Sequence, residues 1–221
     1  MFDLTLSFDN GPEPEVTPRV LDILRERGLK TTFFVIGHKL EDPARRRLAA
    51  RARDEGHWIG NHTYTHAVPL GQQSDMRTAE REIGRTQGLI GALAHEACWF
   101  RPFGGGGNLD TRLLKPSVVG YLTGNGFSCV LWNAIPRDWD DPDGWVERAL
   151  AHCRAHPWTL MVLHDLPTGA MAHLAQFLDR AAIAGARFRQ DFPSDCVPIQ
   201  RGRLVQPIDA YVSTIQESID T

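Results

Sequence analysis

The sequence contains few cysteines, and their spacing excludes one large class of metal site. Its four cysteines are Cys98, Cys129, Cys153 and Cys196. They are widely separated, and no Cys-x-x-Cys pair occurs. Thiolate zinc sites are built from such closely spaced pairs. We therefore interpret the four thiols as small, buried, apolar groups rather than as ligands.

Long apolar runs and clusters of positive charge are also lacking. No stretch of the 221 residues is apolar for the length that crosses a bilayer, so we expect no membrane partner. The formal net charge is −3, and the arginine-dense segment 45–53 fits the solvated face of one helix. Because nonspecific binding to nucleic acid needs a clustered positive surface, we expect no nucleic-acid partner.

The N-terminus shows neither the charged region nor the apolar run of a signal peptide. It opens directly with FDLTLSF at residues 2–8, where apolar and polar residues alternate as they do in a strand. On this basis we expect a cytoplasmic location.

The rest of the chain alternates predicted strands with predicted helices. We expect strands at 2–8, 31–36, 58–59, 99–100, 127–132, 160–163 and 197–199, and helices at 17–28, 42–56, 74–91, 113–125, 145–156 and 171–186. Such alternation implies parallel βαβ units, in either an open doubly wound sheet or a barrel. No linker or repeat is evident, so we predict a single domain over 1–221, with a terminal strand and tail after about residue 190.

The first strand places an acidic residue where barrel enzymes hold their chemistry. Its apolar residues share one face, which leaves Asp3, Thr5, Ser7 and Asp9 on the other. In a barrel the apolar face meets the surrounding helices. Asp9 would then point inward at the C-terminal end of its strand, just before Gly11-Pro12 breaks the strand.

Four further segments carry polar or glycine-rich chemistry, most of them at ends of predicted strands. They are 61–66 (NHTYTH), 100–108 (FRPFGGGGN), 136–139 (PRDW) and 162–165 (VLHD). His62 and His66, at i and i+4, would share one side of a helical turn and reach one cation. The glycine run exposes backbone N–H groups that suit a phosphate or a developing oxyanion. Each segment alone is also compatible with an ordinary surface loop.

The order and spacing of these segments together resemble the five motifs of the polysaccharide deacetylase family, also called carbohydrate esterase family 4 or the NodB-homology domain. The flanking sequence resembles the family too, with TPRVLDIL at 17–24, TTFFVIG at 31–37 and EGH at 55–57. The resemblance covers residues 2–165. It implies a distorted (β/α) barrel of about seven strands and a metal-dependent hydrolase that removes the N-acetyl group of an amino sugar.

The resemblance also implies catalytic roles. Asp9 corresponds to the general base that deprotonates the metal-bound water, and Arg101 keeps that carboxylate ionised and oriented. His164 corresponds to the general acid for the leaving amine, and Asp138 orients His164. A separate base and acid suit the two proton transfers of amide hydrolysis.

The remaining implied roles concern the metal and the acetyl group. His62 and His66 correspond to ligands of a divalent metal, with zinc the expected ion. Trp139 and Leu163 correspond to the lining of the pocket that accepts the acetyl methyl. A cation polarises the carbonyl and lowers the pKa of its water toward ~7. A backbone N–H of the loop that begins at Gly104 would share the oxyanion charge.

Three motifs depart from the family pattern. The family usually has a second Asp as its carboxylate metal ligand, whereas this chain has Asn10, a neutral and weaker zinc donor. We therefore expect weaker metal binding. In the third motif Phe103 arrives one place early, or else Gly104 takes the aromatic position. In the fourth, residues 135–137 (IPR) stand where an additional Asp is frequent.

Three functions stay open on the sequence. The first is metal-dependent deacetylation of an N-acetylated glycan or oligosaccharide, with a more Lewis-acidic metal beside neutral ligands. The second is a catalytically silent or metal-free protein that binds a glycan or a protein partner, and Asn10 motivates it. The third is hydrolysis of a small cyclic or linear amide. An open groove around Asp9 would indicate a polymer, and a lidded pocket a small molecule.

Overall fold

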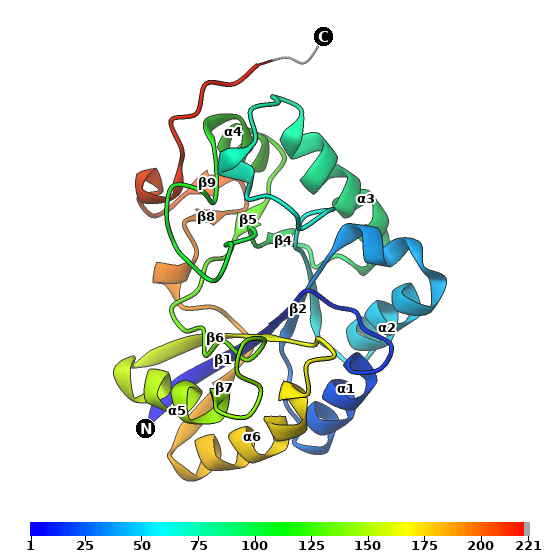
Figure 1. The fold of residues 1–221 in the computed structure, drawn as a ribbon, viewed down its shortest axis with the longest axis vertical. Coiled ribbons are helices and arrows are strands. Elements are labelled where there is room, and N and C mark those ends of the chain that lie inside the picture. The colour runs from blue at the N-terminus through cyan, green and yellow to red at the C-terminus, as the bar shows by residue number, and fades with distance from the viewer. Residues whose placement is uncertain (219–221) are drawn as a thin grey trace.

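A curled sheet runs through the centre of the computed structural model, which describes residues 1–218 (Figure 1). Its strands are β1 (Phe2–Asp9), β2 (Thr32–Val35), β3 (Trp58–Asn61), β4 (Trp99–Phe100), β5 (Ser128–Cys129), β6 (Trp158–His164), β7 (Ala186–Arg189), β8 (Ile199–Gln200) and β9 (Arg203–Leu204). Along the sheet the order is β6-β1-β2-β3-β4-β5-β8-β9, and β7 pairs with β1. Pairings among β1 to β7 are parallel, and β8 and β9 join in antiparallel pairs. This mixed half-barrel confirms the expected fold class.

Helices surround the outer side of the sheet (Figure 1). They are α1 (Thr17–Glu26), α2 (Pro43–Asp54), α3 (Arg85–Ile90), α4 (Pro116–Gly124), α5 (Trp145–Ala155) and α6 (Leu174–Ile183). Among residues 1–218, no helix combines the length and apolar character needed to cross a bilayer.

The two faces of β1 divide as its alternation predicts. Leu4, Leu6 and Phe8 are buried in the largest apolar cluster, together with side chains of α1 and α6. Ser7 and Asp9, on the opposite face, both contact a buried arginine inside the half-barrel. The hydrophobic face therefore anchors the strand and aims the polar face at the interior.

The helix predicted at 74–91 differs from the observed segment. Asp75 caps the start of the turn, because its carboxylate accepts the N–H of Arg77 at 2.9 Å. A π-helical turn then spans Glu80–Gly84 and precedes α3. Such wide turns redirect side chains and are frequent at functional sites. Here the turn carries Glu82, whose carboxylate holds a loop of the candidate site, as described below.

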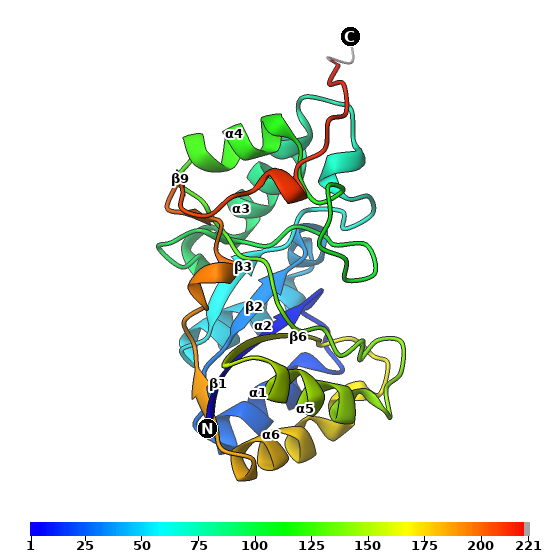
Figure 2. The same cartoon turned by 90° about the vertical axis from the view of Figure 1, so that its left-hand side faces the viewer.

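The segment after β7 returns across the sheet. In Figure 2 it runs along the left of the view, over the ends where the parallel strands begin. The loops that follow the other ends of the strands lie on the right. The two ends of the half-barrel are thus separate surfaces, and the candidate active site lies at the second.

Candidate active site

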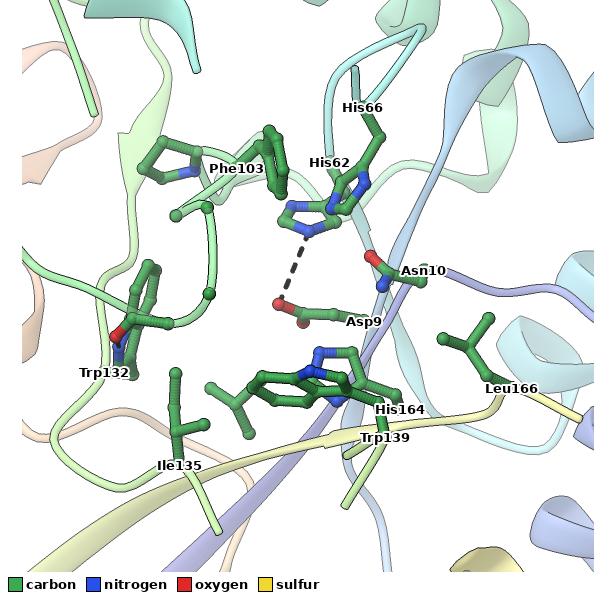
Figure 3. Close-up of a pocket in the computed structure, with 16 residues that line it drawn as sticks. Asp9, Asn10, His62, His66, Phe103, Trp132, Ile135, Trp139, His164 and Leu166 are labelled. Atoms are coloured by element: carbon green, nitrogen blue, oxygen red, sulfur yellow. Dashed lines mark hydrogen bonds and ion pairs between the residues drawn. The ribbon is translucent and has the colours of Figure 1, made fainter. Parts of the chain in front are cut away.

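A pocket of about 230 Å³ lies at the C-terminal ends of the parallel strands (Figure 3). Asp9 at the end of β1, His62 just after β3 and His164 at the end of β6 all line it. Parallel strands present their carboxyl ends at one edge, so residues distant in sequence meet there. The pocket therefore brings the predicted acidic residue and imidazoles together.

Asp9 is held by a fully buried arginine. Nη1 of Arg101 donates to Oδ1 of Asp9 at 2.8 Å and to Oγ of Ser7 at 2.6 Å. The other guanidinium N–H groups reach the carbonyls of Val130 and Leu131, at 3.4 and 3.2 Å. Each charge thus has a partner that offsets the cost of its burial. The carboxylate keeps Oδ2 for the pocket, and this oxygen lies 3.6 Å from Nε2 of His62.

His164 is fixed by a second carboxylate. Oδ1 of Asp138 lies 2.8 Å from Nδ1 of the ring, and its Oδ2 accepts the backbone N–H of His164 at 2.8 Å. Burial lowers the pKa of His164, but the charge and hydrogen bond of Asp138 outweigh burial, and the pKa is raised. The imidazole therefore favours its protonated form, with Nε2 left for the pocket.

The imidazole pair is neutral and oriented. Nδ1 of His62 donates to the carbonyl oxygen of Arg101 at 2.8 Å, which leaves a lone pair on Nε2. The ring centroids of His62 and His66 lie 4.8 Å apart. Burial lowers the pKa of both rings, to about 2 for His66, where the neighbouring His62 lowers it further. Neutral imidazoles are the form that binds metal ions.

The two histidines do not lie on a helical turn, and that prediction is wrong. Thr63 and His66 have positive φ angles of 64° and 52°, which no helix contains. The carboxylate of Glu82 accepts the backbone N–H groups of Tyr64 and Thr65, at 3.0 and 2.9 Å. This carboxylate, from the π-helical turn, shapes the loop that brings the rings together.

Asn10 supplies the third candidate donor to a metal. It has a left-handed backbone, with φ 76°, and lines the pocket beside the two histidines (Figure 3). Its Oδ1 is buried and has no hydrogen-bond partner among residues 1–218, and such an orphaned acceptor is costly. Over the same residues, no group of three His, Cys, Asp or Glu side chains is placed to share a metal. A set of two imidazoles and one amide oxygen still fits a divalent cation.

Leu163 does not line the pocket, which corrects the prediction for this residue. It is fully buried in the apolar cluster on the helix side of β6. Successive residues of a strand face opposite sides, so Val162 and His164 face the pocket instead. Leu166 adds a further apolar contact, and neither Val162 nor Leu166 was predicted. The alternation of β6 predicts this orientation, because Leu163 must face outward if its neighbour His164 faces the pocket.

The glycine-rich loop forms one wall of the pocket, and Phe103 and Gly104 both lie in it. The ring of Phe103 packs against His66 at a tilt of 42°, with centroids 4.0 Å apart. A Cβ on Gly104 would lie 2.6 Å from the indole of Trp132. Trp132 thus occupies the space into which a side chain at 104 would grow, and its Nε1 donates to the carbonyl oxygen of Gly107 at 3.2 Å. The sequence did not single out Trp132.

The loop between β5 and α5 forms an adjoining part of the wall, next to Gly107 of the glycine-rich loop. Trp139 and Ile135 line the pocket there. The indole of Trp139 meets the ring of His164 edge-on, with centroids 4.7 Å apart. Ile135 lies where the fourth motif departs from its pattern, and it places an apolar group in the wall. Leu163, Arg101 and Asp138 are the predicted site residues that do not line this pocket. All the others do.

Known proteins resemble this chain in sequence and in fold. The sequence model of the family described as "Polysaccharide deacetylase" matches residues 3–118. A chitooligosaccharide deacetylase of Sinorhizobium fredii is 34% identical over 189 residues, which are 82% of this chain and 81% of that protein. A peptidoglycan-N-acetylglucosamine deacetylase of Bacillus cereus is 33% identical over 193 residues, 84% of each. The structure of a family 4 carbohydrate esterase from Streptomyces lividans, in complex with acetate, superposes with a TM-score of 0.69. It is 26% identical, and the match covers 90% of this chain and 97% of that one.

Proposed function

Because the chain belongs to the polysaccharide deacetylase family, we propose that it hydrolyses the N-acetyl amide of an amino sugar in a glycan or oligosaccharide. One arrangement carries this proposal: a carboxylate held by a guanidinium and an imidazole held by a carboxylate face the same pocket. Relatives named for chitooligosaccharide and for peptidoglycan N-acetylglucosamine support the choice of substrate class.

Asp9 serves as the proton acceptor in this proposal. Arg101 engages one carboxylate oxygen and leaves the other directed at the pocket. A base fixed in this way removes a proton from the attacking water without first reorganising. The second hydrogen bond of Arg101, to Ser7, holds the guanidinium in place during the reaction.

His164 serves as the proton donor. An amine leaves a tetrahedral centre readily only after its nitrogen is protonated. The imidazolium, with Asp138 on Nδ1, delivers the proton on Nε2 to that nitrogen. Asp138 also fixes the backbone of His164, so the ring and its strand end are positioned by one carboxylate.

His62, His66 and Asn10 would hold a divalent cation, with zinc the first choice for this donor set. When bound, the cation polarises the acetyl carbonyl and acidifies a coordinated water. The carbonyl oxygen of Arg101 fixes the orientation of the His62 ring, as outer-shell acceptors do for ligating imidazoles. A backbone N–H of the glycine-rich loop shares the oxyanion charge. Trp139 and Val162, which both line the pocket, enclose the acetyl methyl.

Acetate release tests the proposal. Purified protein is loaded with zinc, incubated with N-acetylchitotetraose and assayed for acetate, beside the Asp9→Ala variant with its metal content measured. We expect release by the parent protein and loss in the variant, whose zinc content stays unchanged. Full activity in Asp9→Ala would remove Asp9 as the base. Binding of the sugar without any acetate would favour the silent alternative that Asn10 raised.

A further inference from the structure

A cluster of aromatic side chains lies at the end of the half-barrel opposite the candidate active site. Trp58 begins β3, Trp99 begins β4, and Phe192 reaches both from the segment after β7, on the left of Figure 2. The rings of Trp58 and Trp99 are stacked, with centroids 5.7 Å apart. Phe192 meets Trp99 edge-on at 4.9 Å, and His95 lies 4.5 Å from Trp58. Trp99 and Phe192 are each only 9% exposed and pack in one apolar cluster, whereas Trp58 is half-buried at its edge. Trp58 therefore offers the ring on which a ligand can stack.

A hollow of about 430 Å³ opens beside these rings, compared with about 230 Å³ for the candidate active site. Polar and apolar side chains complete its lining: Asp191, Ser194, Val197, Gln200, Val205 and Gln206. Val205 is 47% exposed and adds an apolar side chain to this lining. A hollow with an aromatic wall and a few polar groups is the usual form of a small-molecule site.

The polar groups of this hollow are free to bind a ligand. The side-chain amides of Gln200 and Gln206 make no hydrogen bond within residues 1–218, and both residues are exposed. In the same part of the chain the buried Nε1 of Trp99 has no acceptor. The carboxylate of Asp191 is already engaged, since it accepts from Nε and Nη2 of Arg189 at 2.9 and 2.6 Å. The hollow therefore offers uncharged donors and acceptors and no unpaired charge.

We propose that this hollow is a second binding site, for a neutral sugar ring of a glycan chain. A pyranose presents an apolar face of C–H groups, which stacks on an aromatic ring, and equatorial hydroxyls, which pair with amides. The absence of unpaired charge among the described lining residues disfavours phosphorylated or acidic ligands. The site goes beyond the proposed deacetylation, and rests on it only for the choice of sugar.

A site at this end would act through avidity. A polymer held here keeps the protein near other stretches of the same material, which raises the local concentration of acetylated residues for the pocket at the other end. Short oligosaccharides gain nothing from it. The second site should therefore affect turnover of polymers and leave turnover of a disaccharide unchanged.

Indole N–H signals test the proposal directly. The chain has six tryptophans, so each indole signal can be assigned with a Trp→Phe variant. We expect N-acetylchitotetraose to shift the signals of Trp58 and Trp99 in addition to those of the catalytic pocket. Gln206→Ala should raise the apparent Kd read from the Trp58 signal about tenfold. Trp58→Phe and Trp58→Ala remove that signal, so sugar binding in these two variants is followed by the Trp99 signal. Trp58→Phe, which keeps an aromatic face, should weaken binding less than Trp58→Ala. All three variants should release acetate from N,N′-diacetylchitobiose at the parental rate.

Two results would overturn the second site. One is a titration in which only the signals of Trp132 and Trp139, in the catalytic pocket, respond to the sugar. The other is a Trp58 shift that follows protein concentration instead of sugar, which would assign the hollow to contact between copies of the chain. Failure of the deacetylase proposal looks different, because acetate would be absent while the Trp58 and Trp99 signals still responded.

Discussion

Arg101 and Asp9 form a buried ion pair, with Nη1 and Oδ1 2.8 Å apart, between two strand ends 92 residues apart in the sequence. Arg101 is fully buried and Asp9 is 4% exposed. The pair joins β1 to the chain after β4 and also sets the position of the carboxylate in the pocket. It therefore contributes to stability and to the proposed chemistry at once.

Removing the arginine should cost stability. Arg101→Met leaves the Asp9 carboxylate buried without its partner, and we expect the free energy of unfolding to fall by about 3–5 kcal/mol. Urea unfolding at neutral pH measures it. Arg27→Ala breaks a solvent-exposed pair with Asp179 and should have a much smaller effect. If both variants lost the same free energy of unfolding, the buried pair would contribute no more to stability than the exposed one.

Asp138 should set the alkaline limit of activity. His164 can donate a proton only in its protonated form. We therefore expect kcat to fall as pH rises through the raised pKa of this residue. Asp138→Asn removes the charge that raises this pKa and leaves the burial that lowers it, so the alkaline limb should move to lower pH. The pH profile of kcat is the measurement. Asp143→Asn, at an exposed carboxylate, is the control, and an unmoved limb in Asp138→Asn would argue against His164 as the acid.

Asn10→Asp should strengthen metal binding. A carboxylate in place of the amide adds a charged ligand beside two neutral imidazoles, and Asp tolerates the left-handed backbone at this position. We expect zinc affinity to rise at least about tenfold in a chelator competition, with Asn10→Ala weaker than the parent protein. If Asn10→Asp and Asn10→Ala bind zinc alike, residue 10 is not a ligand.

Gly104→Ala should disturb the pocket wall. Its Cβ would lie 2.6 Å from the indole of Trp132, which is packed and hydrogen-bonded to the glycine-rich loop. Overpacking of this kind typically costs about 1–3 kcal/mol, and both the unfolding free energy and acetate release should fall. Gly88→Ala, on the exposed face of α3 with nothing near the new Cβ, should not destabilise the protein. A neutral Gly104→Ala would mean that the Trp132 side chain moves freely.

Asp165 should make stability depend on pH. Burial raises the pKa of its carboxyl from 3.8 to about 7, against the hydrogen bond from Thr17, which lowers it. A carboxyl with a raised folded-state pKa favours folding when protonated. Its contribution is therefore complete below pH 3.8 and is lost as pH rises through 7. Asp165→Asn should flatten this part of the profile, as measured by urea unfolding across that range. An unchanged slope would locate the titration in another group.

Much of the site could be predicted from the sequence because its parts are local. Alternation in β1 sets which face carries Asp9, and the motif order identifies the residues that follow the other strands. The same alternation applied to β6 points Val162 and His164 inward and Leu163 outward, so the position of Leu163 follows from the sequence too. The shape of the 62–66 loop was not predictable locally, because a carboxylate 16 residues beyond its end, on the π-helical turn, determines it.

The sequence by itself determined the family, the alternation of strands and helices up to α6, and the residue types available for base, acid and metal. It did not predict β7 or β9. Only the tertiary structure decided that Trp132 fills the space beside Gly104, that the Asn10 oxygen is buried without a partner, and that a second aromatic hollow forms at the far end. Periodicity fixes which way a side chain faces within its own element. Contacts between elements depend on how those elements pack, which no local pattern encodes.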